Sequence, residues 1–234
     1  MLVSKRGEKL AARAPFGVPA RYAPSPMPAK SDAARLIVLE GIDGTGKTTL
    51  AASLARRLRA AGLEVVETRE PSSSQAGKKL RQLLAAKERT TSGAQELELF
   101  HADRADHVAR IVRPALQRGA WVVQDRSFWS TAAYQGARGV RVDEILARSL
   151  SIAPKPDLTL LLELAPERAL ERIGRSRAAA SSFERLADLR AVARIYAELA
   201  AREPSIMRVS ADRPLEAVEA DVAEICRARL GEPR

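Results

Sequence analysis

The strongest constraint on the fold is a glycine-rich segment that separates an apolar run from a helix-like run. Residues 36–39 (LIVL) precede it, and residues 49–55 (TLAASLA) follow it. The segment itself reads Gly41, Ile42, Asp43, Gly44, Thr45, Gly46, Lys47, Thr48. This is the pattern of a phosphate-binding P-loop, in the strand–loop–helix setting that such a loop requires. The sequence therefore predicts an α/β protein that binds a nucleotide.

The residue types of this loop each suit phosphate binding. Glycine permits backbone angles that other residues avoid, so several N–H groups can converge on one phosphate. The following helix adds the positive end of its dipole. We expect residues 41–49, including Thr49, to bind ATP, with Lys47 at the outer phosphates and the Thr48 hydroxyl in a Mg²⁺ shell. An ordinary glycine-rich turn is the alternative, and the register of strand, lysine, threonine and helix argues against it.

Composition narrows the class of protein. A length of 234 residues suits one globular domain with a substantial core. The single cysteine, Cys226, excludes an internal disulfide framework. We find no signal peptide and no apolar run long enough to span a bilayer, so we expect a cytoplasmic protein without a membrane partner. The net charge of +10 could indicate nucleic-acid binding. The arginines are dispersed and aromatic residues are only 4%, so we do not expect nucleic-acid binding to be the main function.

The chain divides into a basic segment and a folded part. Residues 1–33 are rich in proline and in basic side chains, and we expect them to form a disordered extension. Strand and helix patterns alternate over residues 34–234, which predicts a P-loop domain with helices on both faces of a parallel sheet. The expected strands are Leu36–Glu40, Glu64–Thr68, Trp121–Gln124, Leu158–Leu162 and Ile206–Val209. The expected helices lie near 47–61, 76–87, 94–117, 143–152, 166–173, 183–201 and 214–229. The small, polar stretch near 174–182 is expected to be a mobile loop.

Polar side chains stand where two of the expected strands end. Ligands of an open α/β sheet bind at the carboxyl edge of the strands. Asp125 is placed there to hold Mg²⁺, and Arg126 follows it and could clamp an acceptor phosphate. A solvated or salt-bridged arginine is the alternative for Arg126. Pro71 ends the second strand, which places Arg69 and Glu70 at the same edge.

Phe100 and Arg104 are four residues apart in a helical stretch and therefore share one face. A ring and a guanidinium on one face could stack a base and hydrogen-bond its edge. From periodicity alone, a core phenylalanine and a solvated arginine are the more probable interpretation.

Six segments together resemble one family, the thymidylate kinases. They are residues 40–49 (EGIDGTGKTT), 68–71 (TREP), 99–104 (LFHADR), 125–126 (DR), 133–136 (AYQG) and 156–159 (PDLT). Their order and spacing match that family over residues 35–229, which is essentially the whole globular part. A P-loop alone would indicate only a nucleotide triphosphatase or a kinase.

The resemblance implies transfer of the γ-phosphoryl group of ATP to dTMP with Mg²⁺, giving dTDP and ADP. It also implies a homodimer and a P-loop kinase fold with about five parallel strands. In this family Phe100 would stack on thymine and Arg104 would bind its edge. Asp43 would contact the acceptor sugar or phosphate, and the other acceptor residues would be Arg69, Arg126, Ser130, Tyr134 and Gln135.

The resemblance also concerns the catalytic arginines. The loop at Gly44 and Thr45 carries no arginine, so we expect the lid to supply one, from Arg175 or Arg177, with Arg172 as a further candidate. The segment at residues 161–165 and the short lid depart from the family pattern, and so do two single positions. Ser127 stands where an aromatic or histidine is usual, and Ala193 stands where an arginine is usual.

Two other functions remain open at this point. One is a related P-loop kinase with a different nucleotide or a deoxynucleoside as acceptor. The other is a nucleotide-regulated binding protein that uses the basic segment and catalyses nothing. A GTPase switch is disfavoured because the sequence has no Asn-Lys-x-Asp motif for reading guanine.

Overall fold

The structure is a computed structural model that describes residues 33–86, 91–174 and 182–231. Its centre is a sheet of five parallel strands in the order β2-β3-β1-β4-β5. The strands are β1 (Leu36–Glu40), β2 (Val65–Arg69), β3 (Trp121–Asp125), β4 (Leu158–Glu163) and β5 (Ile206–Ser210). All five lie within two residues of the expected segments, so the predicted fold class is confirmed.

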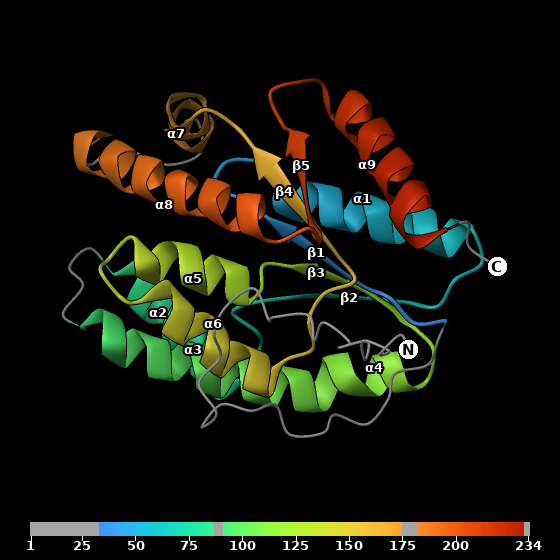
Figure 1. Cartoon of the computed structure of the whole chain (residues 1–234), viewed down its shortest axis with the longest axis horizontal. Helices are drawn as coiled ribbons and strands as arrows, with labels where there is room; N and C mark the ends of the chain where they lie inside the picture. Colours follow the sequence, from blue (N-terminus) through green and yellow to red (C-terminus); the bar gives the residue numbers. More distant parts are fainter. Residues whose placement is uncertain (1–32, 87–90, 175–181, 232–234) are drawn as a thin grey trace, which may run out of the picture.

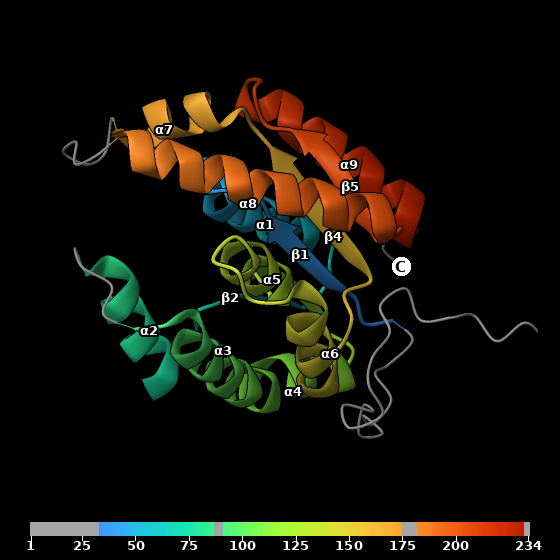
Figure 2. The same cartoon turned by 60° about the vertical axis from the view of Figure 1, so that its left-hand side comes forward.

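Helices cover both faces of this sheet (Figure 1). They are α1 (Lys47–Ala60), α2 (Gln75–Ala85), α3 (Gly93–His107), α4 (Arg113–Gln117), α5 (Phe128–Gly136), α6 (Val142–Ile152), α7 (Pro166–Gly174), α8 (Ser182–Arg202) and α9 (Leu215–Leu230). A five-residue π-helical turn, η2 (Val108–Val112), joins α3 to α4. Figure 2 shows α1 and α9 on one side of the sheet and α3 and α4 on the other.

The two-residue period of the strands divides their side chains between these two layers. In β1, Ile37 and Leu39 pack in the larger core with Leu50 and Leu54 of α1. The alternate residues of β1 pack in a second cluster with η2, α4 and β3, formed by Ala34, Leu36, Val38, Val112, Ala115, Leu116, Ala120 and Val122. All five β1 residues are buried, as expected for a strand covered on both faces.

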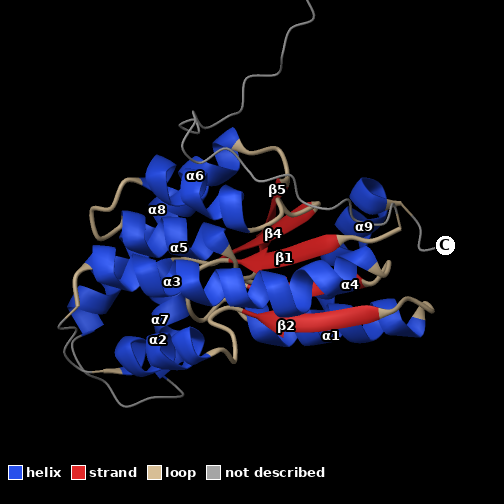
Figure 3. Cartoon of the chain, turned by 90° about the horizontal axis from the view of Figure 1, so that it is seen from below, coloured by secondary structure: helices blue, strands red, loops and turns tan. Residues whose placement is uncertain are grey.

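Because the strands are parallel, their carboxyl ends share one edge of the sheet. Figure 3 shows the arrowheads pointing toward the side where α2 and α5 lie. The phosphate loop follows β1 at this edge, and Asp125 ends the adjacent strand β3. The fold therefore brings the predicted phosphate and metal residues to one place.

The helix expected near 94–117 is present as one continuous helical stretch over 93–117, and only its π-helical turn at residues 108–112 was not predicted. One part of the helical prediction was wrong. Helix α5 was missed altogether, because seven of its nine residues are buried and it has no polar face to produce a helical period. No helix among the described residues combines the length and apolar character that a membrane span requires. The expected extension, and Arg175 and Arg177, lie outside the described residues.

Candidate functional site

The phosphate loop is a turn of closely packed backbone between β1 and α1. Gly41, Gly44 and Gly46 have φ angles of 139°, 87° and 90°, which are strained for residues with a side chain. A Cβ added at Gly41 would lie 2.5 Å from the carbonyl oxygen of Leu162, and one at Gly44 would lie 2.6 Å from that of Ala169. Gly41 and Gly44 are therefore required by both conformation and space, and Gly46 by its conformation alone.

Lys47 begins α1 and folds back over the loop. Its Nζ donates to the Ile42 carbonyl at 2.7 Å and lies 3.4 Å from the Thr45 hydroxyl, and its side chain is buried. Burial, and next the charge of Arg126, lower the pKa of Lys47 to about 7. A ligand phosphate in the loop would replace the carbonyl as partner and favour the charged form.

Thr48 and Asp125 form a pair that suits Mg²⁺. The Thr48 hydroxyl donates to Oδ2 of Asp125 at 2.6 Å. The other oxygen of Asp125, Oδ1, is buried and has no hydrogen-bond partner among the described residues. Mg²⁺ favours one or two protein oxygens together with phosphates and water. The described residues contain no group of three or more His, Cys, Asp or Glu side chains that could hold a metal ion by themselves.

Arg126 extends from the end of β3 toward the phosphate loop. It is the one non-glycine residue with positive φ in the described part of the chain, at 69°. Its guanidinium donates to Asp43 at 2.6 Å and to the Ser130 hydroxyl at 3.1 Å, and it lies 5.3 Å from the centre of the Tyr134 ring. The Tyr134 hydroxyl in turn accepts from the Asp43 backbone N–H at 3.1 Å. Arg126 thus forms an ion pair with Asp43, and its predicted role at an acceptor phosphate stays a prediction.

A buried carboxylate, Glu40, lies beneath Arg126 at the end of β1. It accepts hydrogen bonds from the Ser127 backbone and hydroxyl at 2.7 and 2.8 Å, from Ser130, and from the Tyr196 hydroxyl at 2.8 Å. Burial raises the pKa of Glu40, and these hydrogen bonds with the charge of Arg126 oppose that rise. Ser127, the residue that departs from the family pattern, also caps α5 by accepting from the Trp129 N–H at 3.2 Å.

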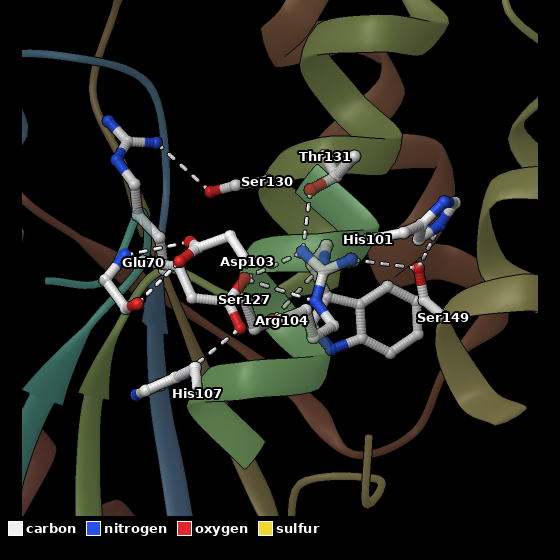
Figure 4. Close-up of polar contacts among 12 residues, drawn as sticks. Glu70, His101, Asp103, Arg104, His107, Ser127, Ser130, Thr131 and Ser149 are labelled. Carbon is white, nitrogen blue, oxygen red and sulfur yellow. Dashed lines mark hydrogen bonds and ion pairs between the residues drawn. The ribbon is translucent and has the colours of Figure 1, made fainter. Parts of the chain in front are cut away.

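A second buried carboxylate, Glu70, lies after β2 and pairs with Arg104 (Figure 4). Nη2 and Nε of Arg104 donate to Oε2 of Glu70 at 2.7 and 3.2 Å. Nη2 also donates to Thr131 at 2.8 Å, and Nη1 donates to Ser149 at 3.1 Å. Burial alone would raise the pKa of Glu70, but the charge of Arg104 and the hydrogen bonds of His107 and Arg104 hold it below its usual value.

Arg104 is therefore not the solvated arginine that periodicity suggested. Its side chain is 0% exposed and four of its five N–H groups have partners. Phe100, one turn earlier on α3, is half-buried. The Glu70 contact could not be anticipated from the helix alone, because it joins residues 34 positions apart.

Arg69 lines a cleft of about 560 Å³ together with Thr48 and Asp125. The remaining lining residues are Ala51, Glu67, Thr68, Pro71, Ser72, Ser73, Arg81 and Ile111. The side chain of Arg69 is exposed and makes no hydrogen bond or ion pair with the described residues. Its cation is therefore available to an anionic ligand beside the metal pair.

The other predicted site residues have different surroundings. Gln135 is buried on α5, and its Nε2 donates to Glu96 at 3.0 Å. Thr49 is exposed on the first turn of α1. Arg172 donates to the Ala211 carbonyl at 3.1 Å, so here it faces the loop after β5. Sequence reasoning assigned no role to Glu40, Thr131, Ser149 or Tyr196; a charged Glu40 at the end of a wholly apolar strand was the available signal.

The parallel sheet, the phosphate loop after its central strand, and the Thr48–Asp125 pair define a P-loop protein of the nucleotide triphosphatase and kinase class. A model of the thymidylate kinase family matches residues 39–222. The chain is 43% identical over 195 residues to a probable thymidylate kinase of Archaeoglobus fulgidus, which covers 83% of this chain and 96% of that protein. It is 42% identical over 189 residues to a thymidylate kinase of Desulfotalea psychrophila, covering 80% of this chain and 92% of that protein.

A thymidylate kinase of Akkermansia muciniphila is also 42% identical over 196 residues, with 84% of this chain and 93% of that protein covered. The chain belongs to the thymidylate kinase family. The resemblance drawn from the six sequence segments is confirmed, and so is the prediction that the chain is an enzyme that phosphorylates a nucleotide.

Proposed function

We propose that the protein transfers the γ-phosphoryl group of ATP to dTMP with the help of Mg²⁺. The observation that carries this proposal is that two arginines from outside α5 donate hydrogen bonds to two adjacent residues of that helix. Arg126 donates to Ser130 and Arg104 donates to Thr131. An acceptor with an anionic phosphate at one end and a base edge at the other matches two guanidinium groups fixed in this way.

The donor end is formed by the phosphate loop. Backbone N–H groups of residues 41–49 and the Lys47 ammonium neutralise the ATP phosphates. Thr48 and Asp125 would hold Mg²⁺, which neutralises charge that develops on the phosphate oxygens when it is bound. Phosphoryl transfer asks little covalent chemistry of the protein, so alignment and charge neutralisation are the main contributions.

The acceptor end uses the residues around α3 and α5. Arg126 and Arg69 bind the dTMP phosphate, Asp43 orients Arg126 and contacts the acceptor, and Tyr134 lies under the deoxyribose. At the base, Phe100 stacks on thymine while Arg104 offers its remaining N–H to the ring edge. Gln135 and Ser130 complete the pocket by positioning rather than by charge.

The catalytic arginines of the lid remain a prediction, because Arg175 and Arg177 lie outside the described residues. Replacing both by alanine should lower kcat by orders of magnitude and leave the affinity for dTMP nearly unchanged. A loss of affinity without a loss of kcat would contradict the assignment. A homodimer and a cytoplasmic location likewise remain predictions, and sedimentation analysis of the purified protein tests the first.

The decisive experiment is an acceptor panel assayed with ATP and Mg²⁺. We expect dTDP from dTMP, and much slower turnover of dUMP, dCMP, dGMP and thymidine. Lys47→Ala is the control, and it should lower turnover by about 100-fold or more, since it removes a charge that faces the transferred group. A preference for another acceptor would replace dTMP in the proposal, and no turnover of any acceptor would favour a non-catalytic nucleotide-binding protein.

A further inference from the structure

Gln124 is a buried polar side chain in the middle of the sheet edge that carries the site. It belongs to β3 and is 4% exposed, on a strand whose five residues are all buried. Its Nε2 donates to the backbone carbonyl of Arg126 at 2.8 Å. The same nitrogen lies 3.4 Å from Oε1 of Glu70. Gln124 thus contacts Arg126, the proposed phosphate ligand, and Glu70, the partner of Arg104. Core packing alone would not require these polar contacts.

The chemistry of these two neighbours fixes the orientation of the Gln124 amide. A backbone carbonyl and a carboxylate both accept hydrogen bonds and cannot donate them. The NH₂ group must therefore face them, because the amide oxygen would be repelled by both. Glu70 thus orients the amide, and the amide in turn holds the Arg126 carbonyl.

Arg126 needs such support because its backbone is in the left-handed region, with φ at 69°. This conformation is unfavourable for a residue with a long side chain, and it persists only where neighbouring contacts enforce it. The Arg126 N–H is held by the Leu39 carbonyl at 2.9 Å, and its carbonyl is held by Gln124. Gln124 therefore supplies the side-chain hydrogen bond that fixes the backbone carbonyl of Arg126.

We propose that Gln124 is a positioning residue, which keeps Arg126 in its left-handed conformation and so aims the guanidinium at the acceptor phosphate. This inference rests on the proposed role of Arg126 in binding that phosphate. Gln124 touches no substrate itself. Its loss should therefore weaken recognition of the acceptor phosphate and spare recognition of the nucleoside.

The test compares the dissociation constants of dTMP and thymidine, measured by calorimetry, for Gln124→Met. Methionine keeps the length of the side chain and removes the N–H donors. We expect dTMP to bind about tenfold more weakly, since an unsupported left-handed residue relaxes to ordinary backbone angles. Thymidine, which lacks the phosphate, should bind as it does to the wild type. In turnover assays, KM for dTMP should rise while KM for ATP stays unchanged.

Two further variants sharpen this comparison. Gln124→Glu presents a carboxylate to the Arg126 carbonyl and to Glu70, so it should weaken dTMP binding more than Gln124→Met does. Thr159→Val is the matched control, because Thr159 is a fully buried polar residue on β4 of the same sheet, and its hydroxyl has no partner among the described residues. It should bind dTMP like the wild type and be at least as stable.

A double-variant cycle separates this inference from the proposed role of Arg126. Arg126→Ala should lose affinity for dTMP and not for thymidine, and adding Gln124→Met to it should cause no further loss. If Arg126→Ala itself affects both ligands equally, the proposed role of Arg126 fails. If Arg126→Ala behaves as expected but Gln124→Met affects both ligands equally, or adds fully to Arg126→Ala, the positioning role of Gln124 is overturned. Thymidine binding by each variant verifies that it is folded.

Discussion

Glu40 and Glu70 are two buried carboxylates at the ends of strands in one sheet, and only one of them has a cation in direct contact. Glu70 faces the guanidinium of Arg104, at 2.7 Å, and its pKa lies below the usual value. Glu40 faces hydroxyl and backbone N–H groups, with Arg126 reaching it only through Ser130, and its pKa lies above the usual value. At Glu40 the hydrogen bonds and the more distant charge of Arg126 do not offset burial, whereas at Glu70 the direct ion pair with Arg104, together with hydrogen bonds from His107 and Arg104, does.

The two carboxylates support different ends of the proposed acceptor site, Glu70 the base end and Glu40 the phosphate end. Glu70 holds a cation that must stay rigid, because Arg104 has only one N–H left for a ligand. Glu40 binds the start of α5 and the Tyr196 hydroxyl of α8, so it connects the two helices next to Arg126, which we call the phosphate clamp. Breaking each carboxylate in turn should therefore have unequal consequences.

The largest effect is expected for Glu70→Ala. This change leaves the Arg104 charge buried without a counter-ion, and we expect the free energy of unfolding to fall by about 3–5 kcal/mol. Urea denaturation followed by circular dichroism measures it. Glu67→Ala is the matched control on β2, the strand that Glu70 follows. Glu67 is exposed and its ion pair with Arg59 is long, at 3.9 Å, so the change should cost less than about 0.5 kcal/mol.

A double variant tests the cause of that loss. Glu70→Met with Arg104→Met removes both charges together, so it should be more stable than Glu70→Ala although it lacks one more polar group. Equal or greater destabilisation of the double variant would show that the pair matters for packing rather than for charge balance. Activity toward dTMP should be lost in either case.

Glu40→Gln should have an intermediate effect. Its amide nitrogen would face donors from Ser127, Ser130 and Tyr196, so at least one hydrogen bond is lost and the free energy of unfolding should fall by about 2 kcal/mol. KM for dTMP should also rise, since Ser130 helps to hold Arg126. Glu163→Gln is the control, because Glu163 ends β4 in a largely exposed ion pair with Arg208. A Glu40→Gln protein as unstable as Glu70→Ala would contradict the comparison.

The parts of this site that the sequence predicted are those that depend on local pattern. The alternation of strands and helices, the phosphate loop, and the placement of Asp125 at a strand end all follow from residues close together in the chain. The partner of Arg104 could not be predicted, because Glu70 lies on another strand and Ser149 on another helix. The left-handed backbone at Arg126 also has no local signal, since a tertiary contact from Gln124 supports it.

The opposite pKa shifts of the two carboxylates predict opposite pH dependences. Glu40 binds a proton more readily in the folded protein, so its contribution to stability is full below pH 4.5 and is lost as the pH rises. Glu70 binds a proton less readily, so its contribution is present above pH 4.5 and is lost as the pH falls. Each slope is at most about 1.4 kcal/mol per pH unit.

These slopes are read from differences between the wild type and a non-titrating variant. The stability advantage of the wild type over Glu40→Gln should shrink as the pH is raised from 4.5. Its advantage over Glu70→Gln should shrink as the pH is lowered from 4.5. If both stability differences changed with pH in the same direction, the two carboxylates would have similar electrostatic surroundings. The proposed contrast between Glu40 and Glu70 would then be wrong.

The smallest effect is expected for Tyr196→Phe. It removes one donor to Glu40 and the 2.9 Å contact of that hydroxyl with Ser130, and it leaves the hydrogen bonds of Ser127 and Ser130 to Glu40 in place. The free energy of unfolding should fall by about 1 kcal/mol, since one hydrogen bond to a buried group is lost without a change of shape. KM for dTMP should change less than twofold by the same reasoning. If Tyr196→Phe instead raised KM as much as Glu40→Gln, the phosphate clamp would be held through α8, and the carboxylate would serve to fix Tyr196 rather than α5.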